Sequence, residues 1–121
     1  MSEALIFVRL TKPGFHCWPG AVGGRSYLGD RHRHLFHVEV ACRVAHDDRE
    51  IEFHDLRDEA AGILDRLGPG GEFGSQSCEA IARQIGEDLA GAHRRAFTVT
   101  VSEDGECGAT VDVPAQEAQA A

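Results

Sequence analysis

The segment GDRHRHLFHVEV (residues 29–40) passes from a charged, histidine-rich stretch directly into alternating apolar and polar residues. Side chains two residues apart on a β-strand point to the same side of the sheet. The alternation predicts a strand over residues 35–44 with one apolar face, made of Phe36, Val38, Val40, Cys42 and Val44. The histidines therefore lie at the N-terminal end of a half-buried strand.

Before this strand, the run ALIFVRLT (residues 4–11) predicts a first strand with Ala4, Ile6, Val8 and Leu10 on one face. Residues 12–30 between the two strands contain two prolines and five glycines. This composition predicts an ordered loop of a length that is usually functional in a compact domain. After residue 44, a turn at HDD and a short strand over residues 49–54 (REIEFH) are expected.

The pattern then changes to a helical period. A helix is predicted over residues 55–67, capped by Asp55, with an apolar stripe of Leu56, Ala60, Ile63, Leu64 and Leu67. A second helix over residues 77–92 has Ser77 as its cap and Ile81, Ala82, Ile85 and Leu89 as its stripe. Residues 96–103 and 107–113 alternate as two strands joined by an Asp-Gly hairpin turn.

The order strand, strand, helix, helix, strand, strand predicts an α+β fold, with two helices on one face of an antiparallel sheet. Both hairpins are also partly apolar on their other face, which favours assembly of several copies. A chain of 121 residues is expected to form one domain over residues 1–113, followed by a disordered tail over residues 114–121.

The net charge of −8 argues against nucleic acid or an anionic membrane as a partner. There is neither a membrane-spanning apolar run nor a basic-then-apolar leader, so a cytoplasmic protein is expected. The four cysteines form no C-x-x-C pair, which argues against a zinc ribbon or a redox dithiol.

His32 and His34 can converge on one metal ion because they lie two residues apart, whereas His37 has the opposite parity. His16 is the expected third ligand, since it lies in the long loop that is best able to fold back. Three imidazoles leave one position open, as in a catalytic zinc site. The H-x-H spacing alone is weak evidence and favours exposed histidines of a polar loop.

Arginines surround these histidines although the protein as a whole is acidic. Arg25, Arg31 and Arg33 form a local basic patch that suggests a small anionic ligand rather than a polymer.

Several motifs together resemble the 6-pyruvoyl-tetrahydropterin synthase and 6-carboxytetrahydropterin synthase family, which adopts the tunnelling fold, or T-fold. They are GFHCWPG and HRHLFHVEV around the histidines, EFHDL at the first helix, SQSCEAIA at the second, and TVSEDG at the last hairpin. The resemblance covers residues 5–113 in the same order of elements.

The resemblance implies that His16, His32 and His34 bind zinc. It further implies that Glu103 holds a pterin or purine ring by accepting hydrogen bonds from its N–H groups, with Ser77, Cys78 and Glu79 lining the same pocket. The family forms oligomeric barrels with sites between subunits, so a homo-oligomer is expected. Glu103 also fits a charged residue beside a turn, and Glu79 a residue favoured by the helix dipole.

The chain departs from the family at two catalytic positions. The family's cysteine upstream of His-x-His is replaced by Leu28, or by Ser26 in the longer spacing, and its Asp-His pair after the first helix is absent from GPGGEFG. Leucine transfers no proton, and an unactivated serine is a poor base near neutrality. Cys17, Asp30 and Glu72 are other candidates for the acid or base.

Three hypotheses follow from these observations. The first is a zinc-dependent lyase or synthase acting on a ligand like dihydroneopterin triphosphate, with its phosphates on Arg25, Arg31 or Arg33 and with altered acid/base groups. The second is a non-catalytic module that binds a metal and a pterin or purine. The third is a scaffold without zinc.

Overall fold

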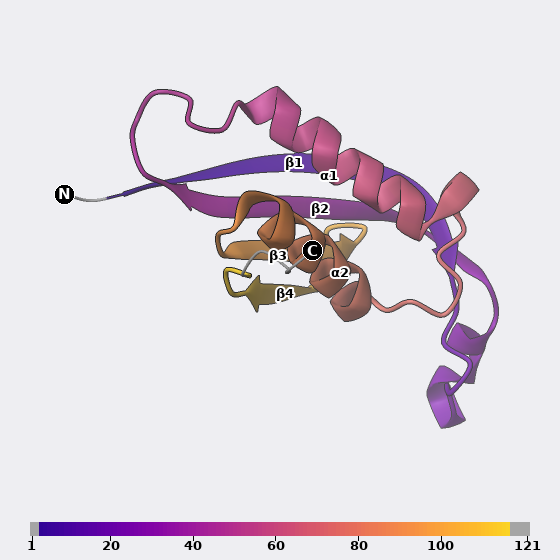
Figure 1. Cartoon of the computed structure of the whole chain (residues 1–121). Coiled ribbons are helices and arrows are strands. Elements are labelled where there is room, and N and C mark those ends of the chain that lie inside the picture. The colour runs from indigo at the N-terminus through magenta and orange to yellow at the C-terminus, as the bar shows by residue number, and fades with distance from the viewer. Residues whose placement is uncertain (1–2, 117–121) are drawn as a thin grey trace, which may run out of the picture.

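The computed structural model describes residues 3–116 as one four-stranded antiparallel sheet with helices packed on it (Figure 1). The strands follow one another across the sheet in the order β1-β2-β3-β4. Along the chain the elements are β1 (Ala4–His16), the 3-10 segment η1 (Gly23–Gly29), β2 (His32–Val44), α1 (Phe53–Leu67), the 3-10 turn η2 (Pro69–Gly71), α2 (Cys78–His93), β3 (Phe97–Glu103) and β4 (Cys107–Val113). The predicted α+β order is confirmed.

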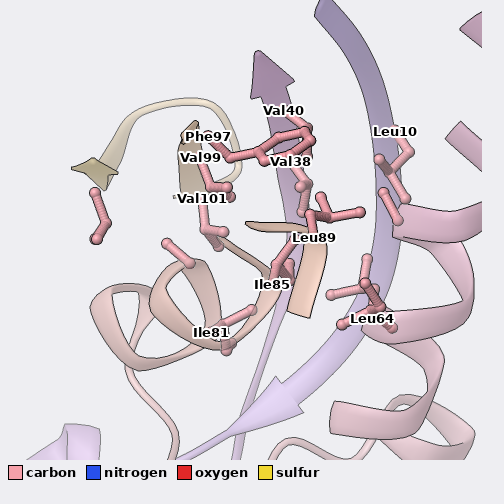
Figure 2. Close-up of a cluster of buried hydrophobic side chains, with 14 of the residues drawn as sticks. Leu10, Val38, Val40, Leu64, Ile81, Ile85, Leu89, Phe97, Val99 and Val101 are labelled. Atoms are coloured by element: carbon pink, nitrogen blue, oxygen red, sulfur yellow. The ribbon is translucent and has the colours of Figure 1, made fainter. Parts of the chain in front are cut away.

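The core lies between one face of the sheet and both helices (Figure 2). The even-numbered apolar side chains of β2 and the odd-numbered ones of β3 point to this face, and Phe36, Val40, Val99 and Val101 have no exposed area. The predicted stripe of α2 is fully buried against them, and of the α1 stripe only Leu67 stays partly exposed. Burial of these faces on one side of the sheet holds the two layers together.

The expected short strand over residues 49–54 is wrong, and so is the cap assigned to Asp55. Residues 49–52 form no strand, with a bend at residues 50–51, and α1 already begins at Phe53. The Glu52 carboxylate accepts hydrogen bonds from the backbone N–H groups of His54 and Asp55 and so caps the helix three residues before the predicted cap. Ser77 caps α2 as predicted, accepting from the Ala80 N–H at 3.1 Å.

The first strand is longer than expected, because the predicted loop does not begin at Lys12. β1 continues to His16 through Pro13 and Gly14. Proline is tolerated because β1 is an edge strand and need not donate at every position. Gly14 is required by packing, since a Cβ there would lie 2.7 Å from the ring of the buried Phe73. Pro13 and Gly14, which are typical of turns and loops, therefore lie inside a strand here.

The face of the sheet away from the helices is polar on β3 and β4 and partly apolar on β1. Directly opposed residues form cross-strand pairs: Thr98 Oγ1 donates to Asp112 at 2.7 Å, and the Thr100 and Thr110 hydroxyls are 2.8 Å apart. On β1, Leu5 and Phe7 are about half exposed. The apolar surface expected from the sequence is thus concentrated at the edge strand.

Within residues 3–116, no helix is long and apolar enough to cross a membrane. Residues 114–116 follow β4 without regular structure, and residues 117–121 of the expected tail lie outside the described part of the chain.

We predict opposite effects for two glycine-to-alanine substitutions in α2. A Cβ at Gly86 would lie 2.5 Å from Val113 Cγ2, and such overpacking costs about 1–3 kcal/mol, more than the roughly 1 kcal/mol gained in helix propensity. A Cβ at Gly91 would meet only Gln116 Oε1, at 3.9 Å, which is an ordinary van der Waals contact, so Gly91→Ala is expected to stabilise by about 0.5–1 kcal/mol. Urea unfolding of both variants checks this. Stabilisation by Gly86→Ala would contradict the close packing.

A second prediction concerns Glu50, which joins the loop before α1 to the start of β3. Its carboxylate accepts from the Arg95 guanidinium at 3.0 Å and from the Ala45 N–H at 2.6 Å, and these bonds, chiefly the first, lower the pKa of Glu50 to about 2. Because the folded pKa lies below the unfolded value of about 4.3, Glu50 stabilises the fold above that pH. The contribution declines as the pH falls from there towards 2.

Glu50→Gln is therefore expected to be less stable than the wild type at pH 7, with the difference shrinking between about pH 4.3 and 2. Urea unfolding at several pH values measures the difference. Glu106→Gln, in the β3–β4 turn, serves as the control for removing one charge. An unchanged difference down to pH 2 would show that the ion pair contributes no proton-linked stability.

Candidate metal centre

The pairing of β1 with β2 places three histidines together at one end of the sheet. His16 is the last residue of β1 and lies directly opposite His32, the first residue of β2. His34, two residues along β2, points to the same side as His32, as predicted. The ring centroids of His16, His32 and His34 are 4.6–5.2 Å apart, with the rings edge to face. His16 reaches this position through strand register rather than by a loop folding back.

Glu103 completes the group from the end of β3, where it is the cross-strand partner of Phe36. Its Oε2 atom lies 2.8 Å from His16 Nε2 and 3.2 Å from His34 Nε2. One potential ligand atom from each of His16, His32, His34 and Glu103 lies within 4.8 Å of all the others. Glu103 therefore lies at the same end of the sheet as the three histidines and in contact with two of them.

Each imidazole is held by its Nδ1 atom. His16 Nδ1 is 2.9 Å from the Gln76 carbonyl oxygen, His32 Nδ1 is 2.8 Å from the Asp30 carbonyl oxygen, and His34 Nδ1 is 2.8 Å from Asp104 Oδ2. Carbonyl and carboxylate oxygens only accept, so each Nδ1 must carry the proton. In the neutral rings the Nε2 atoms are consequently left as lone-pair acceptors.

The Nε2 atoms that lack a hydrogen-bond partner show whether a metal ion suits this cluster. Within residues 3–116, His16 Nε2 and His34 Nε2 are buried and find no hydrogen-bond partner, because Glu103 Oε2 approaches them without hydrogen-bond geometry. Lone pairs and a carboxylate oxygen facing one another repel unless a proton or a cation lies between them. Zinc ligands at about 2.0–2.2 Å in a tetrahedron lie about 3.4 Å apart. Glu103 Oε2 lies 2.8 and 3.2 Å from the His16 and His34 Nε2 atoms, and the potential ligand atoms of all four residues lie within 4.8 Å of one another. The residues fit a zinc ion.

Asp104 is the functional residue that the sequence analysis missed. With Gly105 it forms the β3–β4 turn, and both have positive φ, as an Asp-Gly turn of the primed type requires. Its Oδ1 accepts from the Leu35 N–H at 2.8 Å while Oδ2 faces His34. The Leu35 N–H, and then the His34 ring, hold the pKa of Asp104 below its ordinary value. The sequence feature that could have pointed to Asp104 is its position in the predicted turn, directly after Glu103.

A cavity of about 570 Å³ opens beside the histidines, between the sheet end and the start of α2. The side chains of His16, His32 and Glu103 line it, together with Cys17, Trp18, Leu28, Ser75, Gln76, Ser77, Cys78, Glu79, Cys107 and Gly108. This volume suits a small molecule. Another hollow, of about 420 Å³, lies at the far end of β1 and β2, but no metal-ligating cluster faces it among the described residues.

The predicted pocket residues at the start of α2 all line this cavity. Ser77 and Glu79 are exposed there, and Cys78 is buried. Burial raises the pKa of the Cys78 thiol to about 12, with Glu103, Glu79 and Cys107 adding to the shift. Cys78 therefore stays a neutral thiol near pH 7 and is a poor nucleophile there.

Of the acid/base candidates Cys17, Ser26 and Asp30, only Cys17 lines the cavity. Leu28 lies beside it, because the Trp18 N–H donates to the Leu28 carbonyl at 2.7 Å. Cys17, next to His16 in the chain, and Leu28 therefore line the same cavity. Asp30 contributes only its carbonyl oxygen, to His32.

The three arginines predicted to contact phosphate lie outside the lining of this cavity. Arg31 forms an ion pair with Glu72, and its guanidinium stacks 3.6 Å from the centroid of the Phe15 ring. The same contact lowers the pKa of Glu72, which makes this candidate base a weaker one. Arg25 and Arg33 are exposed.

Comparison of the chain with known protein-family models and with curated proteins finds no match.

Proposed function

We propose that this protein is a zinc-binding, T-fold protein similar to 6-pyruvoyl-tetrahydropterin synthase, which binds a pterin or purine in the cavity beside the metal. One observation carries the proposal: three imidazoles, each tethered through Nδ1, turn their Nε2 lone pairs toward one another and toward Glu103. Such outer hydrogen bonds orient metal-bound histidines in proteins.

The protein groups then have separate roles. Zinc, when bound, acts as a Lewis acid on a carbonyl or hydroxyl oxygen of the ligand. Glu103 lies at both the metal cluster and the cavity, so its carboxylate can accept hydrogen bonds from the amino and ring N–H groups of a pterin or purine. Cys17 is the group best placed to give or take a proton, since it lines the cavity next to a histidine ligand.

Assembly into a barrel belongs to the same proposal. β1 is an edge strand that leaves Leu5 and Phe7 half exposed, and β4 is the other edge. Unpaired edges and exposed apolar side chains favour pairing with further copies of the chain.

A non-catalytic metal- and pterin- or purine-binding module is the second candidate. Leu28 favours it, because this side chain lines the cavity where the related synthases carry their catalytic cysteine. The two candidates differ in a single measurable property, which is turnover of the bound ligand.

Zinc binding is the first outcome to test. We expect about one equivalent of zinc per chain in protein purified without added metal, measured by elemental analysis. His32→Ala and His34→Ala should lose it, because each removes one of three imidazole ligands. His37→Ala, on the opposite face of β2, is the matched control and should retain the metal. Metal-free protein that takes up no zinc on titration would leave the scaffold hypothesis.

Turnover is the second outcome. Zinc-loaded protein is incubated with 7,8-dihydroneopterin or its triphosphate, and the pterin products are followed by chromatography. If Cys17 transfers the proton, Cys17→Ser should lower the rate by about 10²–10⁴-fold with zinc content unchanged. Cys107→Ser, in the same cavity lining, is the control and should keep its rate. Tight ligand binding without any product over hours would instead favour the binding module.

A further inference from the structure

The cavity beside the metal cluster has an unusual balance of charges. Two carboxylates line it, Glu79 and Glu103, together with three thiols and several neutral polar groups. Among the described residues, neither lysine nor arginine contributes to this lining. A zinc ion would bring two positive charges, which the two carboxylates balance. The loaded cavity therefore carries little net charge to attract an anion.

Two basic residues close to the histidines in sequence form contacts outside the lining of the cavity. Arg31 is held by Glu72 and by the Phe15 ring, and Lys12 donates to Asp65 at 2.6 Å. Recruiting Arg31 to a phosphate would require breaking its ion pair and its stacking contact. The arginine patch suggested by the sequence therefore does not form a phosphate cradle facing the cavity.

A further source of positive potential among the described residues is the start of α2, which lines the cavity. Residues at the start of α2 already neutralise part of this positive potential. The Ser77 hydroxyl accepts from the Ala80 N–H, and the Glu79 carboxylate lies in the first turn, where it interacts favourably with the helix dipole. A phosphate placed here would meet the negative charge of Glu79.

We propose that the cavity takes an unphosphorylated, neutral or cationic ring that presents N–H donors to Glu79 and Glu103, and that it discriminates against the polyphosphate form of the same ring. This inference rests on the proposed pterin or purine site and specifies its ligand class. The carboxylates supply acceptors for ring amino and imino groups, and the exposed Trp18 supplies an aromatic surface at the rim.

The test compares two probes on the zinc-loaded protein by calorimetry: 7,8-dihydroneopterin and its triphosphate. The unphosphorylated ring is expected to bind at least about tenfold more tightly, with an affinity that changes less than about twofold between roughly 50 and 500 mM NaCl. Equal or tighter binding of the triphosphate, weakening steeply with salt, would overturn the inference while leaving the proposed function intact. It would indicate that a neighbouring copy supplies the cations.

Glu79→Lys adds the missing cation to the cavity. It is expected to raise the affinity for the triphosphate by about tenfold or more, whereas Glu87→Lys, the same charge change elsewhere on α2, should leave it within about threefold. Equal gains in both variants would show a non-specific charge effect and contradict the assigned cavity. If neither probe binds although zinc is present at one equivalent, the pterin site itself is wrong, and the inference falls with it.

Discussion

The register of β1 against β2 is the constraint on which the candidate site depends. Antiparallel pairing runs without interruption from Ala4 opposite Val44 to His16 opposite His32. A slip of one residue would turn His32 and His34 to the other face and would expose Phe36 and Val38. The hydrophobic core and the histidine cluster are therefore specified by the same set of backbone hydrogen bonds. Burial of the apolar face fixes the geometry of a polar site at the end of the sheet.

Much of the fold could be predicted because the core residues obey simple periods. The stripes of both helices, the Ser77 cap and the hairpin at Asp104 and Gly105 were confirmed, since each follows from local sequence. The errors arose where tertiary contacts override local preference. Pro13 and Gly14 suggest a loop, yet an edge position tolerates the proline and the Phe73 ring requires the glycine.

The site was predictable to a lesser degree. Strand parity brought His32 and His34 together, but the position of His16 depended on a strand extension that local sequence did not suggest. The tethers were harder to predict: Gln76 acts through its carbonyl oxygen, and the role of Asp104, although this residue stands in the predicted turn beside Glu103, arises only after β2 and β3 are paired. Charges were the hardest to interpret. Arg31 is close to the histidines in sequence but is committed to Glu72 in space.

The segment over residues 17–31 has both ends anchored by the last pair of the β1–β2 ladder. Closing a flexible loop depends weakly on its length, by about 0.6 kcal/mol for each doubling. Insertions, deletions or exchanges in this segment would therefore leave the strand pairing of His16 with His32 intact while changing side chains that line the cavity. Cys17 and Leu28 are two of the cavity-lining residues in this segment. The histidine cluster is thus fixed by the strand ladder, whereas the chemical character of the cavity beside it can change with a single loop.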